Sequence, residues 1–490
     1  MGVVFFDKIP VTTKKSIVYN LKDFSKGLDK TIVENLLPPY KSVDTFNFNY
    51  VKKGLVDGLG VKPLVIYNGD STKTMQTPSD VGSVLGFWVY NKFDGHRYVP
   101  QLMIYGSNES IYTGTVPTLN PEFYKTSITF SRVPVCYNYK INNQNCFLAC
   151  STDKIVVFNE AQNQTYTQNV PSIVSVAFYK DRLFALLENN DNKVFFSSTL
   201  NPTSWNMTSF DGETLELNDG RGPCRKLIEA GDYLYVIRDY GISRITYSER
   251  DDSFSVNHVF KTMGKIYANS TVLCGNEIYF LCRDGLYCFS SGKVKKLVLG
   301  IEEYLNKVEN NASIGAFLFG KLYLALKLKF NDGLTIGCES SNYVNNALLE
   351  YDFHTNQVNL LRGVDASAMC EYQSEWASKL VVCLRNGNIC ELTTDGKVNS
   401  ASTLKMWKSG FTDFGYAKLH KVIKRINLNT KQDIVFSINA DGIEKDLVIH
   451  GDSLPISVPV NLRARKFSFT ILSENADNEI SNVEFEIDLC

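Results

Sequence analysis

The chain has 490 residues, enough for more than one domain, and its 51 basic and 52 acidic residues leave a formal net charge of −1. Apolar residues make up 44% and charged residues 21%, a globular profile that excludes an extended disordered chain. The balance of charges excludes a composition dominated by a basic nucleic-acid-binding face. Thirty Phe and 26 Tyr against five His favour strands and leave little imidazole for acid–base or metal sites.

Residues 1–63 contain no repeated hairpin and are expected to form an N-terminal arm. The apolar run Val3–Phe6 is too short for the core of a signal peptide. A short helix is expected at Asp29–Leu37, because Pro38 and Pro39 would end it there. No apolar stretch in the chain reaches about 18 residues, so no membrane-spanning segment is expected.

Hairpins recur loosely through the middle of the sequence. Each copy has a polar turn, an apolar strand, a second turn at Asp or Gly, and another strand. The copies are spaced by about 35–55 residues, which is the period of a four-stranded propeller blade. Residues 64–404 are therefore expected to form a β-propeller of about seven blades, with six as the alternative count. The clearest copies are Lys180–Phe196, Gly231–Tyr247, Gly275–Phe289 and Ser378–Leu392.

The alternative for the hairpins is a β-sandwich or an irregular array, but their regular recurrence favours the propeller. Small sheets of this kind cover one another by stacking around an axis. The apolar strands Leu183–Leu187 and Leu322–Leu326 are expected nearest to that axis, where space is tight. A second helix is expected at Gly300–Asn310 from its apolar periodicity.

Residues 405–490 contain alternating strands separated by turns and are expected to form a C-terminal β-sandwich. Strand alternation would place Lys421 and Arg425 on one solvated face. The short basic groups in this region give no clustered footprint for a duplex, so specific DNA binding is not expected. The expected strands are Val422–Asn427, Asp433–Ile438, Asp446–Ile449, Lys466–Ile471 and Ile480–Ile487.

The sequence offers little catalytic chemistry. Twelve cysteines lie at irregular separations without a C-x-x-C pair, so they are expected to be reduced, buried small hydrophobes. Phosphate-binding, zinc-protease, nucleophile-elbow and dinucleotide motifs are absent. The five histidines lie in separate segments and are expected at the surface. No catalytic residue, cofactor or metal is therefore expected, and the chain is not expected to be an enzyme.

An alternative function is a propeller glycan-binding protein or a sialidase-like glycoside hydrolase, since that architecture places arginines and carboxylates at the axial mouth. Ser197–Trp205 and Ser209–Thr214 invite this comparison, although neither matches a full Asp-box hairpin. A turn at Asn201-Pro202, with Trp205 packed over it, explains the first stretch more simply. A third hypothesis is an isolated scaffold for peptide partners, which predicts a stable monomer.

Short motifs near both ends of the chain are Phe24-Ser-Lys-Gly-Leu28, Leu36-Leu37-Pro38, Asn47-Phe-Asn49, Trp407-Lys-Ser-Gly410, Phe414-Gly415 and Arg463–Phe469. In this order they resemble propeller-bearing tail hub or nozzle (tail-stabilisation) proteins of tailed, especially short-tailed, bacteriophages. The resemblance implies a homo-oligomeric ring below the portal and adaptor proteins. Such a ring helps to close the DNA channel before ejection and carries tail fibres or spikes. It also implies assembly in the host cytoplasm, a final location in the virion tail, and passing DNA that is not specifically bound.

A ring protein of this kind works through interface area, and aromatic and arginine anchors commonly dominate such interfaces. For each candidate anchor, the alternative is internal packing of the arm and the sandwich on the propeller. The candidate interface residues are Phe24, Leu36, Leu37, Trp407, Phe411, Phe414 and Arg465.

Overall fold

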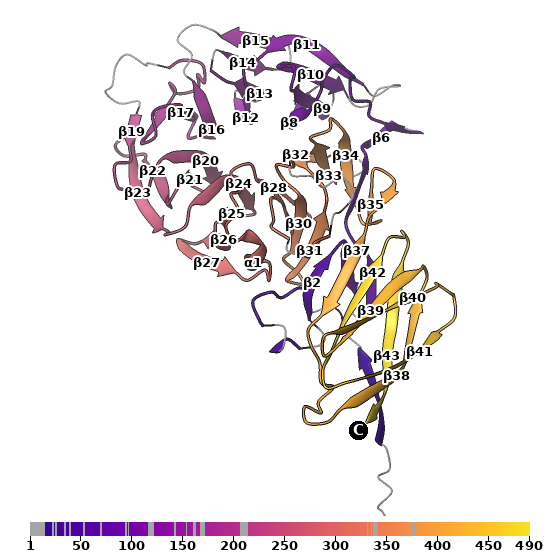
Figure 1. Cartoon of the computed structure of the whole chain (residues 1–490). Helices are drawn as coiled ribbons and strands as arrows, with labels where there is room; N and C mark the ends of the chain where they lie inside the picture. The colour runs from indigo at the N-terminus through magenta and orange to yellow at the C-terminus, as the bar shows by residue number, and fades with distance from the viewer. Residues whose placement is uncertain are drawn as a thin grey trace, which may run out of the picture. The chain divides into compact units, whose positions relative to one another are not determined.

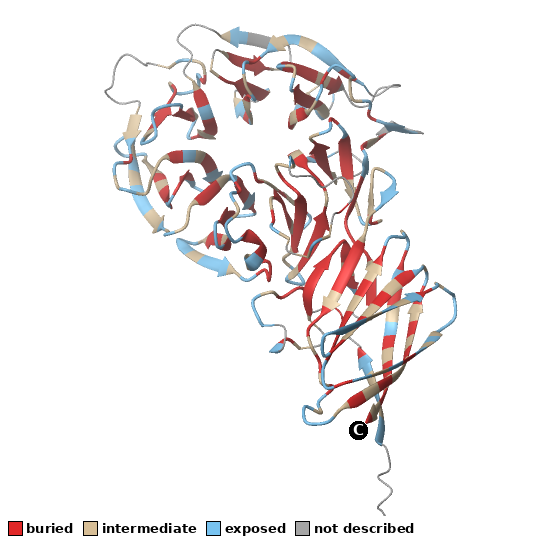
Figure 2. Cartoon of the chain, viewed as in Figure 1, coloured by how far each residue is buried: buried red, intermediate tan, exposed pale blue. Residues whose placement is uncertain are grey.

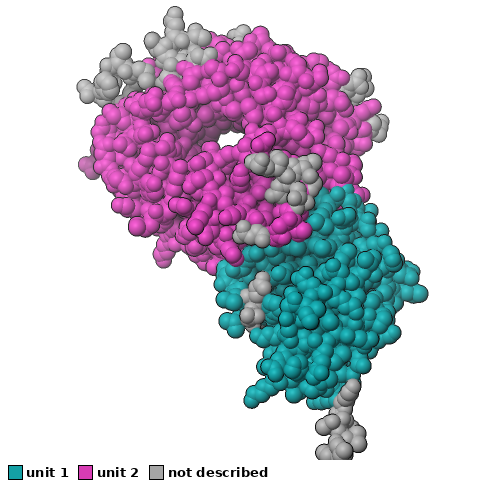
Figure 3. Space-filling view, in the orientation of Figure 1, with its two compact units in different colours: residues 1–58, 402–490 teal, residues 59–401 magenta. Residues whose placement is uncertain are grey.

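β-Strands dominate the chain, which divides into two compact units: unit 1 (residues 1–58 and 402–490) and unit 2 (residues 59–401) (Figure 3). The one α-helix among the described residues is α1 (Glu302–Leu305), and none of their helices is long and apolar enough to cross a membrane. The computed structural model describes residues 15–490 except for 22–23, 25–26, 34–35, 39–40, 52–53, 69–70, 94–95, 97, 116–121, 142–143, 153, 160–162, 167–171, 206–213, 331, 335, 337–341 and 374–377.

Unit 2 is a β-propeller whose described part has seven blades around a central axis (Figure 1). The first six blades are antiparallel sheets of four strands each, taken in chain order. Their strands, four to a blade, are β8 (Val84–Phe93), β9 (Tyr98–Gly106), β10 (Ser110–Thr115), β11 (Phe123–Thr129); β12 (Val135–Ile141), β13 (Gln144–Cys150), β14 (Ile155–Phe158), β15 (Asn163–Tyr166); β16 (Ile173–Tyr179), β17 (Arg182–Leu187), β18 (Lys193–Phe196), β19 (Thr214–Glu216); β20 (Cys224–Ala230), β21 (Tyr233–Arg238), β22 (Gly241–Ser248), β23 (Ser253–Lys261); β24 (Ile266–Cys274), β25 (Glu277–Cys282), β26 (Gly285–Ser290), β27 (Lys293–Leu297); β28 (Ile314–Leu318), β29 (Lys321–Leu326), β30 (Ala347–Asp352) and β31 (Gln357–Arg362).

The seventh blade joins the two ends of unit 2. Three of its strands follow the sixth blade in the chain, and β5 completes it by pairing antiparallel with β34, with Val61 opposite Leu392. Unit 2 therefore begins at residue 59 and ends at 401, whereas the expected propeller covered 64–404, because the segment before residue 64 supplies the closing strand. The strands are β32 (Ala366–Gln373), β33 (Ser378–Leu384), β34 (Ile389–Thr393) and β5 (Gly60–Pro63), with β35 (Lys397–Val398) and β36 (Ala401–Ser402) extending the sheet and β6 (Val65–Asn68) and β7 (Ser71–Thr74) forming a separate hairpin.

The first strand of each blade is innermost, because these strands contact one another from β12 round to β32 and on to β8. The apolar strands Leu183–Leu187 and Leu322–Leu326, expected nearest to the axis, instead lie in β17 and β29, the second strands of their blades. A second strand is covered on both faces by neighbouring blades, which explains its continuous apolar run. Figure 2 shows the resulting burial of the blade interiors.

One lysine lies between two blades. Lys226 of β20 donates a hydrogen bond from Nζ to the carbonyl oxygen of Thr271 in β24, at 2.9 Å. Burial disfavours its charged form and lowers the pKa of Lys226 from about 10.5 to about 8. Below about pH 8 the amine is charged in both states, so folding bears the whole free-energy cost of burying that charge. This cost decreases as the pH rises above 8 and is gone once the pH exceeds the unfolded-state pKa.

Replacing Lys226 with Met should remove this pH dependence. We expect the free energy of unfolding of the wild-type protein to rise relative to that of Lys226→Met between about pH 8 and 10.5, by up to about 3 kcal/mol, because the amine becomes neutral in both states. Urea denaturation of both proteins at several pH values measures the difference. A difference that is constant over this range would contradict the lowered pKa.

Unit 1 is a β-sandwich of two facing sheets that draw strands from both ends of the chain. Ile426 and Phe485 of the first sheet share a core with Phe436 and Phe469 of the second, and the rings of Phe469 and Phe485 stack at 4.4 Å. The first sheet has the order β3 (Phe48–Val51), β4 (Gly54–Asp57), β43 (Glu479–Leu489), β38 (Lys421–Thr430) and β41 (Ile456–Ala464), with β1 (Lys15–Leu21) also on β43; the second has the order β2 (Ser42–Phe46), β37 (Lys405–Ser409), β42 (Phe467–Ser473), β39 (Ile434–Ala440) and β40 (Ile443–Ile449).

The N-terminal segment differs from the expected arm. Strands β1 and β4 both pair antiparallel with β43, and β2 pairs with β37, so the described N-terminal strands are part of the sandwich. The residues described in Asp29–Leu37 form no α-helix; Glu34 and Asn35 lie outside the described residues. At Gly300–Asn310 the helix is shorter than expected, since α1 covers only Glu302–Leu305.

Two details of the C-terminal strands also differ from expectation. Strand β41 was not expected, and Pro459 lies within it; β41 is at the edge of its sheet, where proline is tolerated. A β-bulge in β38 between Ile423 and Arg425 reverses the alternation of faces. Lys421 is consequently buried and donates to the carbonyl oxygen of Arg465 at 2.6 Å, so it does not share a solvated face with Arg425.

Candidate functional site

Irregularities recur at the same place in the innermost strands of unit 2. The ladders of β8, β16, β20 and β32 each skip one residue near the start of the strand, where these strands begin at one mouth of the central channel. A bulge leaves the extra residue out of the ladder and turns its side chain in a new direction. The four residues turned out in this way are Leu85, Val174, Arg225 and Ser367.

Strand β24 has a larger irregularity at the same mouth. Its pairing with β25 passes from Tyr267 directly to Val272. The hydroxyl of Ser270 replaces the missing ladder contacts, since it accepts from the backbone N–H of Leu281 at 2.9 Å and donates to the carbonyl oxygen of Tyr267 at 2.6 Å. Asn269, next to Ser270, is exposed. The irregular segment thus presents an asparagine side chain near the axis.

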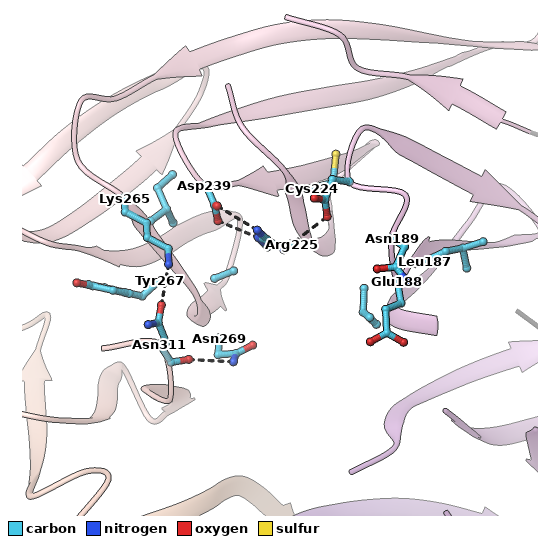
Figure 4. Close-up of a pocket in the computed structure, with 14 residues that line it drawn as sticks. Leu187, Glu188, Asn189, Cys224, Arg225, Asp239, Lys265, Tyr267, Asn269 and Asn311 are labelled. Atoms are coloured by element: carbon cyan, nitrogen blue, oxygen red, sulfur yellow. Dashed lines mark hydrogen bonds and ion pairs between the residues drawn. The ribbon is translucent and has the colours of Figure 1, made fainter. Parts of the chain in front are cut away.

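Two of the four bulge residues, Val174 and Arg225, border a hollow of about 600 Å³ together with Asn269, and we call it the mouth hollow. Its lining comes from the third to sixth blades and includes exposed Val174, Arg225 and Asn269 together with loop residues. Figure 4 shows the labelled lining residues, and Figure 3 shows the opening through unit 2. The loop residues include Glu188, Asp191, Asp239, Lys265 and Asn311.

Arg225, Asp239 and Glu188 of the mouth hollow are already engaged, and Figure 4 shows the pair of Arg225 and Asp239. The guanidinium of Arg225 donates to both carboxylate oxygens of Asp239, at 2.9 and 3.2 Å, and this pairing raises the pKa of Arg225. Hydrogen bonding from Ser172, followed by the nearby charge of Arg132, lowers the pKa of Glu188.

Other lining residues make weaker polar contacts. The side chain of Asp191 is 55% exposed and lies 3.7 Å from Arg225 Nη1. Lys265 Nζ donates to Asn311 Oδ1 at 2.9 Å, and Asn269 Nδ2 donates to the carbonyl oxygen of Asn311 at 3.2 Å. The hollow therefore offers both donors and acceptors, and its two loosely engaged charges, Lys265 and Asp191, are of opposite sign.

The predicted interface residues do not all lie at the surface of unit 1. Phe24, Leu37, Trp407 and Phe414 are buried, and the rings of Phe24 and Trp407 meet edge to face at 5.1 Å. Phe24, Trp407 and Phe414 belong to the apolar core of the sandwich, so for these three the structure shows internal packing. The remaining three residues are accessible: Leu36 is 76% exposed, Phe411 is half-buried and Arg465 is exposed.

Four of the seven predicted residues nevertheless surround one hollow in unit 1, of about 280 Å³. The side chain of Leu36 lines this hollow and is largely exposed to solvent, whereas the buried Leu37 and Phe414 line its inner side. We call this the Leu36 hollow. Its lining includes Tyr19, Leu36, Leu37, Phe411, Phe414 and Lys466.

One cluster in the fourth blade contains the residue types of a hydrolase triad. Nδ1 of His258 lies 3.1 Å from the hydroxyl of Ser243 and 2.9 Å from a carboxylate oxygen of Asp219. A nucleophile triad places serine and carboxylate on opposite ring nitrogens, whereas both contacts here fall on the same nitrogen. Ser243 is also fully buried, so this geometry does not support nucleophilic attack by its hydroxyl.

The stretch that invited comparison with sialidases forms a turn. The backbone N–H of Ser198 donates to the carbonyl oxygen of Ser204 at 3.0 Å, and the ring of Trp205 packs against a buried cluster of the second and third blades. The second stretch, Ser209–Thr214, lies outside the described residues except for Thr214. Among the described residues no three His, Cys, Asp or Glu side chains gather to hold a metal ion.

No protein-family model matches the chain, and no curated protein matches it. Among solved structures, the chain is similar to one described as the crystal structure of BBS1N in complex with ARL6DN, soaked with lead. The TM-score is 0.44 and the sequence identity 10%, over 70% of this chain and 99% of that chain. So distant a likeness carries no argument about function, and the fold follows from the sheet topology: the described residues form a β-propeller of seven blades and a β-sandwich.

Proposed function

We propose that this chain is a structural component of a bacteriophage tail, a hub or nozzle subunit that forms a ring below the portal and adaptor proteins. The ring helps to close the DNA channel and provides attachment surfaces for fibres or spikes. DNA passes through it without specific binding. In this proposal the subunits assemble in the host cytoplasm and remain in the virion tail.

The observation that carries the proposal is the convergence of Leu36, Leu37, Phe411 and Phe414 on the Leu36 hollow. These residues lie in the motifs that resemble phage tail proteins or directly beside them. A leucine that is 76% exposed beside a hollow with several apolar lining residues is typical of a surface that a partner covers.

A ring joins two different surfaces of the same chain, and unit 1 exposes apolar side chains at a second place. Strand β40 is at the edge of its sheet, where Ile443 and Val448 are 67% and 66% exposed, and Leu454 after it is 67% exposed. We propose that this β40 surface of one copy contacts the Leu36 hollow of the next copy.

Leu36→Glu and Val448→Glu should each prevent ring assembly, because each places a charge in an apolar contact whose central residues contribute at least about 2 kcal/mol. An equimolar mixture of the two variants should form dimers but no rings, since only one intact contact remains for each pair. Native mass measurement distinguishes these species. Val298→Glu, at an apolar side chain of unit 2 that is 75% exposed, is the control and should leave assembly unchanged.

A monomeric wild-type protein would contradict the proposal, as would variants that still form rings.

The second candidate function is the propeller glycan-binding protein or sialidase-like hydrolase, which the polar mouth hollow favours. Arg225 and Glu188 are both held in ion pairs there, which suits binding better than proton transfer by a free carboxylic acid.

A further inference from the structure

The mouth hollow combines donors and acceptors that three blades bring together. Asn269 of β24 offers an amide, Lys265 offers an ammonium, and Asp191 offers a carboxylate that is 55% exposed. A sugar hydroxyl can donate one hydrogen bond and accept two, so adjacent hydroxyls can use such a mixture. A hydrocarbon ligand would shield these polar groups from water without offering them further hydrogen bonds.

Compensated charges favour a neutral ligand. Arg225 is bound by Asp239 through two hydrogen bonds, and Glu188 is bound by Arg132 at 3.1 Å. An anionic or cationic ligand would have to compete with these contacts, and breaking an ion pair leaves a charge without its partner. A neutral ligand with hydroxyl groups leaves both pairs in place.

The size and the apolar part of the hollow agree with a short saccharide. About 600 Å³ is within the usual range for small-molecule sites. Val174, turned out by its bulge and 37% exposed, offers an apolar contact for the C–H face of a sugar ring. Tyr267 offers no stacking face, because it is only 2% exposed and its hydroxyl donates to the carbonyl oxygen of Val308 at 3.1 Å.

We propose that the mouth hollow of the propeller binds a neutral oligosaccharide through Asn269, Asp191 and Lys265, with Val174 against one sugar ring. The recurring bulges of the innermost strands are then the feature that builds the site, since they turn Val174 and Arg225 toward this mouth. This binding is independent of the ring contact proposed above, because its residues all lie in unit 2.

The test applies the purified full-length chain to a printed array of defined neutral and acidic oligosaccharides and measures the dissociation constant of the best neutral one by titration calorimetry. We expect binding to at least one neutral oligosaccharide. Asn269→Ala and Asp191→Ala should each weaken it about tenfold, because each removes one hydrogen-bonding group. Asn257→Ala, at another exposed strand asparagine on the outermost strand β23, should change it less than about twofold.

Each other outcome overturns the proposal: no neutral oligosaccharide binds, only acidic ones bind, or both hollow variants bind as tightly as the wild-type chain. A peptide array is run in parallel. If the chain binds a peptide and Asn269→Ala weakens that binding, while no oligosaccharide binds, the hollow is a peptide site. Thermal unfolding of the two variants checks that each is folded, and both replaced side chains are exposed. Native mass measurement on the same samples shows whether the ring forms, so failure of one proposal is distinguishable from failure of the other.

Discussion

Val61→Asp should unfold the propeller or lower its free energy of unfolding by about 4 kcal/mol or more, because it buries a carboxylate without a partner. Val61 is fully buried in the closing strand β5, opposite Leu392 and Val398, and belongs to the apolar cluster between the sixth and seventh blades. Without β5 the seventh blade loses the strand that links the start of unit 2 to its end. Urea denaturation followed by circular dichroism measures the effect.

The neighbouring residue supplies the control for this prediction. Lys62 is in the same strand, but its side chain is 47% exposed and pairs with Glu391 at 3.2 Å. Lys62→Gln should cost less than about 1 kcal/mol, as is usual for an exposed ion pair. If Val61→Asp were as mild as Lys62→Gln, β5 would not close the propeller.

Lys405→Met should lower the free energy of unfolding of unit 1 by about 3–5 kcal/mol, the usual cost of breaking a buried ion pair. The side chain of Lys405 is fully buried, and Nζ lies 3.1 Å from Oδ1 of Asp57, which is itself only 9% exposed. Nζ also donates to the carbonyl oxygen of Asn475. Methionine fills similar space but leaves the Asp57 carboxylate without its cation.

A double variant and an exposed pair test this interpretation. Lys405→Met/Asp57→Asn should recover most of the loss, because the amide oxygen still accepts from the backbone N–H of Asp477 and no buried charge remains. Lys431→Met breaks an exposed pair with Glu479 and should cost less than about 1 kcal/mol. Trp407 is the single tryptophan of unit 1, so the unfolding of this unit can be followed by the fluorescence of that residue. A double variant no more stable than Lys405→Met would show that charge burial is not the cause.

The propeller could be predicted because its signal is local. Each blade contains hairpins whose second strand, such as β21 or β25, is a continuous apolar run between two turns, and these runs repeat along the chain. The sequence does not indicate whether that run is the first or the second strand of its blade. A strand buried on both faces reads the same whether it is first or second from the axis, so Leu183–Leu187 was placed too close to the axis.

Pairings between distant parts of the chain could not be read from the sequence. Strand β1 pairs with β43 through Lys15 opposite Leu489, and β5 closes a blade whose other strands begin at residue 366. Such pairings form only when distant parts of the chain come together in the folded structure. Lys15–Leu21 contains no local pattern that indicates its partner strand. For the same reason the N-terminal segment was expected as an arm instead of as strands of the sandwich.

The candidate sites illustrate a similar limit. Aromatic and leucine residues near the motifs were predicted as anchors, but composition alone does not separate Trp407, which is 1% exposed, from Leu36, which is 76% exposed. The mouth hollow was missed altogether. Bulges turn Val174 and Arg225 toward it and leave no distinctive residue pattern in the sequence, while its loop residues come from separate blades.

The proposed tail ring is tested most directly by cryo-electron microscopy of the particles produced from the genome that carries this sequence. We expect several symmetry-related copies of this polypeptide around the DNA conduit of the tail, with the Leu36 hollow of each copy against β40 of the next. Absence of the polypeptide from the particle would contradict it, as would a single copy lying away from the conduit.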